Sequence, residues 1–208
     1  MKTLFVYFCK LILFPITDLF TEKVEGRVNI PRQGGFIVAA NHITGWDHCF
    51  IADVLKERAK DLRFIGAMDS VKTFFQSSLI YYLANTITIN RKKVDRKALL
   101  GKMVKCLEEN RIVIIYPEGA SNKKEELLKG KTGVAELILK STVPVLLIGT
   151  EKVFNKRIIK IGKPLYFAPE RKMAEGIKNE EEYHLYLREV ADKIMREISA
   201  LCGKPYSI

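Results

Sequence analysis

A histidine and an aspartate five residues apart, His42 and Asp47, are the residues of this chain best suited to chemistry. They stand between an apolar run at 36–40, which predicts a buried strand, and apolar residues at helical spacing over 50–55. Asp47 is therefore expected at the N-cap of a helix, and Gly45 permits a tight turn before it. A carboxylate bound to one imidazole nitrogen fixes the tautomer and leaves the other nitrogen free as a base. The spacing predicts a proton-abstracting dyad.

Three further segments decide between this dyad and the alternative, a buried histidine beside a capping aspartate. The first, at 86–91, is a strand that ends in arginine, and the second, at 114–119, is a strand followed by a proline-glutamate-glycine turn. The third, at 143–147, is an apolar strand that opens with Val-Pro. With Asn41 before the histidine, the segments stand in the order of the glycerolipid acyltransferase motifs, of which the first is NHxxxxD. From about residue 36 to about residue 162 the chain resembles this family, which includes the 1-acyl-sn-glycerol-3-phosphate acyltransferases.

The resemblance implies a role for each matching residue. His42 would be the general base and Asp47 would orient it. Arg91 would bind the phosphate of the acceptor, for which a planar guanidinium is well shaped. The remaining substrate-binding or site-ordering residues would be Asn41, Glu118, Gly119 and Lys131.

The chain departs from the family pattern after the glutamate-glycine pair. Ala120-Ser121-Asn122 stands where the family usually has Thr-Arg-Ser. Lys131, at a basic position of the family shortly before Gly133, is expected to supply the charge of the missing arginine. Recognition of the acceptor is therefore the part of the resemblance that transfers least directly.

The resemblance implies transfer of a fatty acyl group from acyl-CoA or acyl-carrier protein to the 2-hydroxyl of 1-acyl-glycerol-3-phosphate, giving phosphatidic acid. Because the thioester donor is already activated, no cofactor and no nucleophile are required, although an acyl-enzyme on Cys49 is an alternative. Two other functions stay open. The same chemistry on another lysolipid, an amino-acid lipid or a glycolipid is favoured by Ala120 and Ser121. A non-catalytic, basic membrane-binding protein is disfavoured by the intact dyad.

The net charge predicts an anionic partner. Thirty-five basic and 24 acidic residues give +11, with an isoelectric point near 9.4. Since the spacing typical of nucleic-acid modules is absent, the charge favours an anionic membrane surface and phosphorylated substrates over nucleic acid. Four dispersed cysteines predict free thiols in a reducing compartment, and three histidines without ligand spacing predict no metal site.

The first 25 residues are predicted to form a membrane-associating helical segment, followed by an acyltransferase domain at 26–208. Lys10 divides the apolar stretch into uncharged runs of seven residues, too short for the roughly 20 that a spanning helix needs. A helical wheel places apolar residues on one arc, opposite Lys10, Thr3 and Thr17: Leu4, Phe5, Phe8, Leu11, Ile12 and Ile16. This arc favours a helix in the membrane interface, and hence a peripheral or monotopic protein on the cytoplasmic face of the cell membrane. An ordinary helix packed on the core is the alternative.

The order of apolar runs predicts a single α/β domain with a central mixed, largely parallel sheet flanked by helices. Strands are expected at 36–40, 62–66, 86–90, 112–116, 143–148 and 158–161, and helices at 47–59, 70–84, 94–109 and 131–141. Apolar residues at helical spacing from 183 to 198 predict a C-terminal helix, preceded by a charged connection at 169–178.

Overall fold

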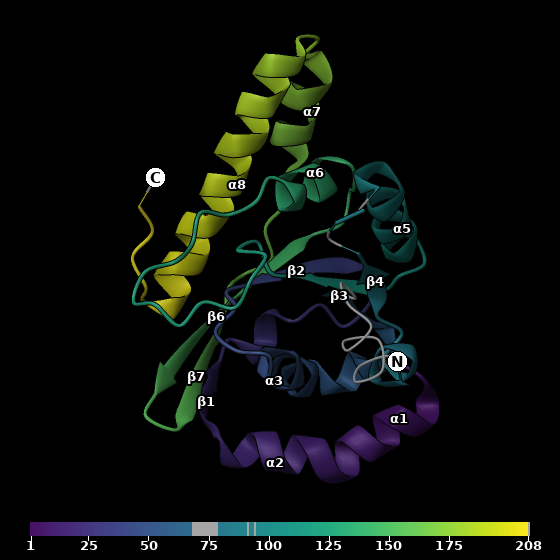
Figure 1. Cartoon of the computed structure of the whole chain (residues 1–208), viewed down its shortest axis with the longest axis vertical. Helices are drawn as coiled ribbons and strands as arrows, with labels where there is room; N and C mark the ends of the chain where they lie inside the picture. Colours follow the sequence, from purple (N-terminus) through teal and green to yellow (C-terminus); the bar gives the residue numbers. More distant parts are fainter. Residues whose placement is uncertain (68–78, 91, 94, 208) are drawn as a thin grey trace.

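The computed structural model describes residues 1–67, 79–90, 92–93 and 95–207. They form an α/β domain around a seven-stranded sheet with the strand order β1-β7-β6-β2-β5-β3-β4 (Figure 1). All neighbouring strands pair in parallel except β6 and β7, which form an antiparallel hairpin. The strands are β1 (Thr21–Glu25), β2 (Phe36–Ala40), β3 (Leu62–Ala67), β4 (Ile87–Ile89), β5 (Ile112–Ile115), β6 (Val145–Val153) and β7 (Lys156–Ile161). The predicted mixed, mostly parallel sheet is confirmed.

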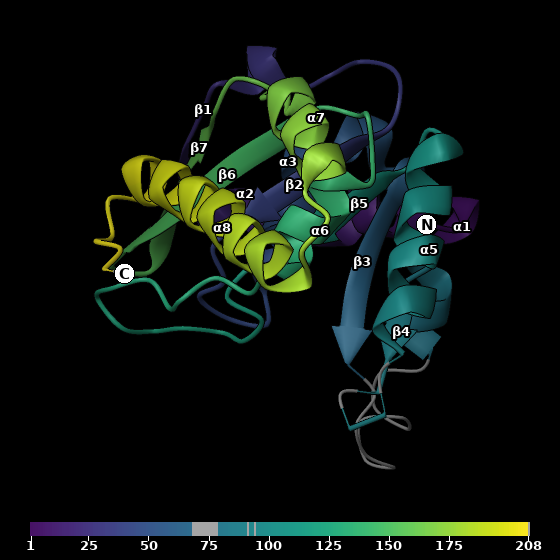
Figure 2. The same cartoon turned by 90° about the horizontal axis from the view of Figure 1, so that it is seen from above.

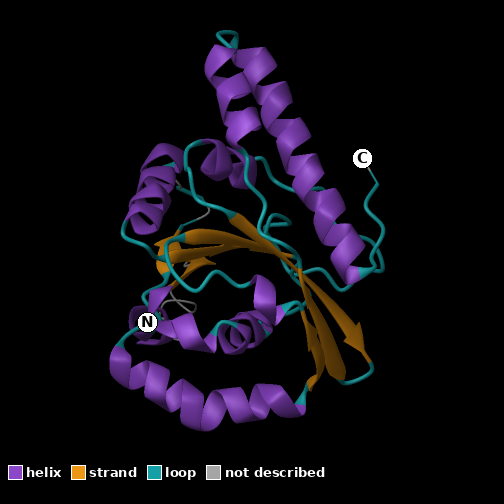
Figure 3. Ribbon diagram, turned by 180° about the vertical axis from the view of Figure 1, so that it is seen from behind, coloured by secondary structure: helices purple, strands orange, loops and turns teal. Residues whose placement is uncertain are grey.

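Helices cover both faces of the sheet (Figures 2 and 3). The N-terminal helices and α3 lie on one face, and α5, α6 and α8 lie on the other, with α7 packed beside α8. Their bounds are α1 (Thr3–Phe8), η1 (Cys9–Leu13), α2 (Phe14–Leu19), η2 (Arg27–Asn29), α3 (Asp47–Val54), η3 (Lys56–Asp61), α5 (Arg96–Glu108), α6 (Gly133–Leu139), α7 (Ala168–Gly176) and α8 (Glu180–Cys202).

The central strand β2 separates two hydrophobic clusters. Its five residues are all buried, and because side chains alternate along a strand, Val38 packs with the cluster under α3 and Ile37 with the cluster under α8. A strand buried on both faces reads as a continuous apolar run, which is why this one was predicted correctly. The chain leaves β2 directly into the segment that carries His42 and Asp47.

Three expectations need correction. The charged connection at 169–178 is the helix α7, which has no buried residue and whose sequence is mostly polar and charged. Residues 21–25, expected to be the end of the N-terminal helical segment, form the strand β1 instead; its sequence, Thr-Glu-Lys-Val-Glu, is polar, as suits an edge strand, and gave no apolar pattern. The helix expected at 47–59 is divided into α3 and the 3₁₀-helix η3, and the one expected at 70–84 lies mostly outside the described residues, with 79–83 helical.

The N-terminal helical segment, α1 to α2, has apolar residues on two sides. Met1, Val6, Cys9 and Phe14 are buried in the core against α3 and neighbouring elements. The other side exposes eight large side chains: Leu4, Tyr7, Phe8, Leu11, Ile12, Ile16, Leu19 and Phe20. Within the described part of the chain, no helix is long and apolar enough to cross a membrane.

Candidate active site

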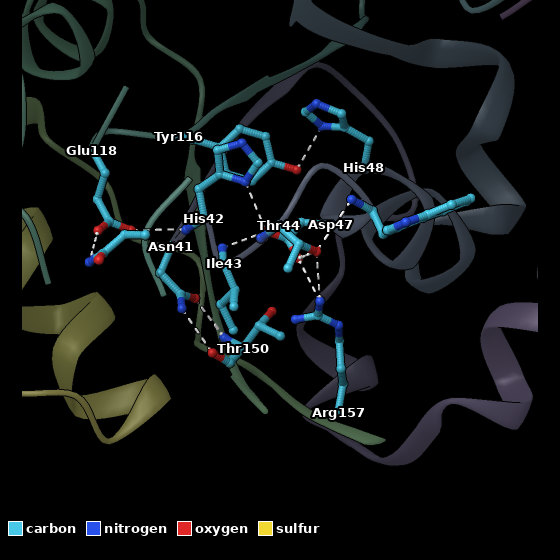
Figure 4. A network of polar contacts seen from close by, with 12 residues as sticks. Asn41, His42, Ile43, Thr44, Asp47, His48, Tyr116, Glu118, Thr150 and Arg157 are labelled. Atoms are coloured by element: carbon cyan, nitrogen blue, oxygen red, sulfur yellow. Dashed lines mark hydrogen bonds and ion pairs between the residues drawn. The ribbon is translucent and has the colours of Figure 1, made fainter. Parts of the chain in front are cut away.

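The aspartate of the dyad is turned back onto the loop before its helix (Figure 4). Its Oδ2 accepts hydrogen bonds from the amides of Ile43 (2.6 Å) and Thr44 (2.8 Å) and lies 2.8 Å from Nδ1 of His42. The predicted N-cap role is wrong: Trp46 is the N-cap, and Asp47 is the first residue of α3, with its carboxylate committed to the loop. Because a carboxylate only accepts, the proton of the neutral His42 ring lies on Nδ1, and Nε2 is free to act as a base.

An arginine from β7 completes the surroundings of this carboxylate. Nη2 of Arg157 lies 3.2 Å from Oδ1 of Asp47 and donates to Oγ1 of Thr44 at 2.9 Å. The arginine side chain is buried, and its guanidinium carbon lies 4.7 Å from the ring centre of Phe50. The charged bond and the packing together fix the orientation of Asp47. The sequence prediction missed Arg157, because it stands beside Lys156 in a strand that also contains Lys160, and nothing in that pattern ties it to Asp47.

Asn41 joins the loop to the sheet. Its amide nitrogen donates to the carbonyl of Thr150 at 2.8 Å, and its amide oxygen accepts from the same residue's N–H at 2.7 Å. Asn41 is buried, so this pair of bonds locks the end of β2 against β6. The histidine that follows is thereby held at a fixed place on the edge of the sheet.

Glu118 holds the same loop from the other side. Its Oε1 accepts from the backbone N–H of His42 at 2.9 Å, and Oε2 accepts from Nδ2 of Asn122 at 2.8 Å and from the N–H of Leu128 at 3.0 Å. Asn122 also donates its own N–H to the carbonyl of His42. Glu118 is only 3% exposed, and its carboxylate is engaged by donors of the protein itself. The asparagine that departs from the family pattern is therefore a partner of this glutamate.

A cavity of about 880 Å³ lies beside the dyad. His42, His48 and Tyr116 line it together with side chains from β3, β4, α5 and α6. Its apolar lining includes Ile65, Ile89, Leu99, Leu100, Met103, Ile115 and Val134. Its charged lining consists, among the described residues, of Arg96, Lys129, Lys131, Glu136 and Arg188, of which Arg188 is paired with Asp192. The cavity thus combines a base, an apolar wall and positive charge.

Gly119 and Lys131 meet at the edge of this cavity. The backbone of Gly119 has φ = +71°, and a Cβ there would lie 2.5 Å from Cε of Lys131. The glycine therefore allows both the turn and the close approach of the lysine. The structure brings these two predicted residues together with His42, whereas Arg91 lies outside the described residues.

Burial sets the protonation of the groups near the dyad. Burial lowers the pKa of His48 to about 4, with a smaller contribution from the neighbouring His42, so this imidazole is neutral at pH 7. Burial raises the pKa of the Tyr116 hydroxyl well above its usual value. It also raises the pKa of the Cys49 thiol to about 11, which keeps the thiol protonated and disfavours an acyl-enzyme at this residue.

Comparison with known proteins identifies the class. The sequence matches the family described as Acyltransferase over residues 22–150, so the chain belongs to the acyltransferase family, and the resemblance found in the motifs is confirmed. A 1-acyl-sn-glycerol-3-phosphate acyltransferase of Borreliella burgdorferi is 26% identical over 148 residues, 65% of this chain and 54% of that protein. The beta enzyme of the same name from Homo sapiens is 30% identical over 119 residues, 53% of this chain and 39% of that protein.

The chain thus spans about half the length, or less, of these relatives. A crystal structure of the 1-acyl-sn-glycerophosphate acyltransferase PlsC from Thermotoga maritima has the same fold, with a TM-score of 0.57 and 22% identity. That similarity covers 92% of this chain and 82% of the other.

Proposed function

We propose that the protein is a membrane-associated O-acyltransferase that moves a fatty acyl group from acyl-CoA or acyl-carrier protein to the 2-hydroxyl of 1-acyl-glycerol-3-phosphate. The observation that carries the proposal is the dyad: Asp47 fixes the His42 tautomer, and the ring lines a cavity with apolar and cationic walls. The names of the relatives support the acceptor.

The reaction follows from the free Nε2 of His42. This nitrogen accepts the proton of the acceptor hydroxyl as its oxygen attacks the thioester carbonyl carbon. The negative charge of Asp47 stabilises the imidazolium that forms. When the tetrahedral intermediate collapses, the C–S bond breaks, and the imidazolium returns its proton to the departing thiolate.

The remaining predicted residues order the site or bind the acceptor. We assign Asn41 and Glu118 to the first role, because both are buried and bonded to the protein's own groups. Lys131 is exposed beside Gly119 and lines the cavity together with Arg96 and Lys129, which suits an anionic phosphate. The apolar wall of that cavity suits an acyl chain. The assignment of Arg91 to the phosphate stays a prediction.

The exposed side of the N-terminal helices supports attachment to a membrane. Leu4 is 84% exposed and Leu11 is 78% exposed, in a row that continues to Leu19 and Phe20. Large apolar side chains gathered on one side of a helical segment mark an interaction surface, and an interfacial helix buries such a surface among lipids. The charge of +11 favours anionic lipids. We therefore propose a peripheral or monotopic protein of the cytoplasmic face.

The dyad is tested by supplying the purified protein with acyl-CoA or acyl-carrier protein and a panel of lysolipids, followed by mass analysis of the products. Asp47→Asn should lower kcat by about 10⁴-fold, as the comparable change in a serine protease triad does by stabilising the wrong tautomer. His42→Ala, which removes the base, should lower kcat by several orders of magnitude. His184→Ala, at an exposed histidine of α8, is the matched control and should be fully active. Near-normal transfer by His42→Ala would disprove the mechanism. If the protein acylated only lysolipids that lack a phosphate monoester, the acceptor would not be 1-acyl-glycerol-3-phosphate.

Membrane attachment is tested by point substitution, because deletion of the first 20 residues would also uncover the core around Val6 and Phe14. Leu11→Glu should reduce co-sedimentation with vesicles that contain anionic lipid and leave the unfolding midpoint unchanged. Leu185→Glu, at a position on α8 that is 67% exposed, is the control and should bind as the wild type does. Equal binding by the two variants would contradict the assigned surface.

A further inference from the structure

A second imidazole lines the cavity beside the base. His48 follows Asp47 in the first turn of α3, and its ring centre lies 5.6 Å from that of His42, with 34° between the ring planes. Both rings line the same cavity. The two imidazoles therefore lie next to each other on the wall of one cavity.

Tyr116 determines which nitrogen of His48 carries the proton. Its hydroxyl lies 2.9 Å from Nδ1 of His48, while its ring stacks on His42 with 4.3 Å between ring centres (Figure 4). Within the described part of the chain, no other acceptor lies within hydrogen-bond distance of this hydroxyl. With Nδ1 as its one partner among the described residues, the O–H is satisfied only when it donates to Nδ1, and the proton of a neutral imidazole then lies on Nε2.

We propose that His48 is a second catalytic residue: its Nε2–H donates a hydrogen bond to the thioester carbonyl oxygen as that oxygen becomes negatively charged. The proposal rests on the acyl transfer proposed above. As the new C–O bond forms, the π electrons of the carbonyl move to the oxygen that His48 holds, and the hydroxyl proton moves to His42. On collapse the carbonyl re-forms and the C–S bond breaks, so His48 neither gains nor loses a proton.

A neutral imidazole is well suited to this position. The lowered pKa of His48 keeps the ring uncharged when His42 becomes an imidazolium, so the two rings do not repel each other. A neutral N–H that is already oriented stabilises developing charge without reorganisation in the transition state. Tyr116 supplies that orientation, since its bond to Nδ1 fixes the ring as well as the tautomer.

The kinetic test uses His48→Leu, which removes the donor, and His48→Gln, which retains an N–H donor near the position of Nε2. His48→Leu should lower kcat by about 100- to 1,000-fold, the usual effect of losing one donor to an oxyanion, with little change in KM for either substrate. His48→Gln should recover part of that loss. A His48→Leu protein within threefold of wild-type kcat, or a loss that lies entirely in KM, would overturn the proposal.

The tautomer is tested without activity, by ¹⁵N NMR of histidine-labelled full-length protein. The wild type should show the Nε2–H form of His48 at pH 7, and Tyr116→Phe should lose that preference. An Nδ1–H form in the wild type would overturn the proposal. A wild-type protein that transfers no acyl group would refute the proposed function together with this role, whereas a fully active His48→Leu protein would refute the role of His48 alone.

Discussion

Replacement of Glu118 by glutamine tests whether this residue orders the site or touches the substrate. The carboxylate accepts three hydrogen bonds, from the backbone of His42, the side chain of Asn122 and the backbone of Leu128. Glutamine has nearly the same shape, but one of its two terminal atoms is an NH₂ group that cannot accept. In either orientation of the glutamine amide, its NH₂ group therefore faces at least one of the three N–H donors that the carboxylate accepted from.

The size of the effect follows from the two orientations of that amide. With its oxygen toward Asn122 and Leu128, only the N–H of His42 loses its acceptor; with its oxygen toward His42, the other two donors lose theirs. A buried donor without an acceptor costs about 1–3 kcal/mol, so the first orientation is the more favourable. Glu118→Gln should therefore lower the free energy of unfolding by about 2 kcal/mol. It should also reduce kcat, because the backbone of His42 is no longer held.

Urea unfolding and steady-state kinetics measure the two effects together. Glu125→Gln, at an exposed glutamate of the same loop, is the control and should change neither quantity. The reasoning fails if Glu118→Gln unfolds at the wild-type midpoint and raises only KM for the acceptor. Glu118 would then bind substrate directly.

Other substitutions test the neighbours of the dyad. Arg157→Met removes a buried charged bond to Asp47 and should cost about 2–3 kcal/mol of unfolding free energy, with partial recovery by Arg157→Lys; a loss below about 0.5 kcal/mol would contradict this. Because the folded protein lowers the pKa of His48 from 6.5 to about 4, the unfolded chain binds an extra proton between these values and stability falls as the pH falls through them. The wild type should lose up to about 3 kcal/mol between pH 6.5 and pH 4 through this group, a loss that His48→Gln should not show in urea titrations. Gly119→Ala should cost about 1–2 kcal/mol, because φ is +71° and the new methyl group displaces Lys131, and an unchanged unfolding midpoint would argue against that strain.

The parts of the fold that the sequence predicted are those with a strong apolar pattern. The buried strands β2, β5 and β6 are continuous apolar runs, and the long helix α8 repeats apolar residues at helical spacing. By contrast, β1 has no fully buried side chain and α7 has no buried residue, so neither contains an apolar run. The sequence favoured either a core helix or a membrane helix at the N-terminus. The structure shows apolar residues on two sides, one packed on the core and the other exposed.

The dyad could be predicted because its two members are close in sequence and belong to a recognisable motif. Arg157 could not, since it approaches Asp47 from a strand about 110 residues later and depends on the order of strands in the sheet. The same limit applies to the bond between Tyr116 and His48, which are 68 residues apart. The partners that hold the dyad in place are thus set by the tertiary fold.

The connection between the N-terminal helices and β1 fixes the distance from the exposed helices to the dyad. The carbonyl of Phe20, directly after α2, accepts a hydrogen bond from the N–H of Arg157 at 2.8 Å, and the side chain of that arginine binds Asp47. From the exposed helices to the dyad the path runs through paired strands, with no linker between them. If the helices rest on a bilayer, the depth of the base relative to the lipid head groups is therefore a constant of the fold. Acceptors would then be selected by where their hydroxyl lies along the membrane normal, as well as by their head group.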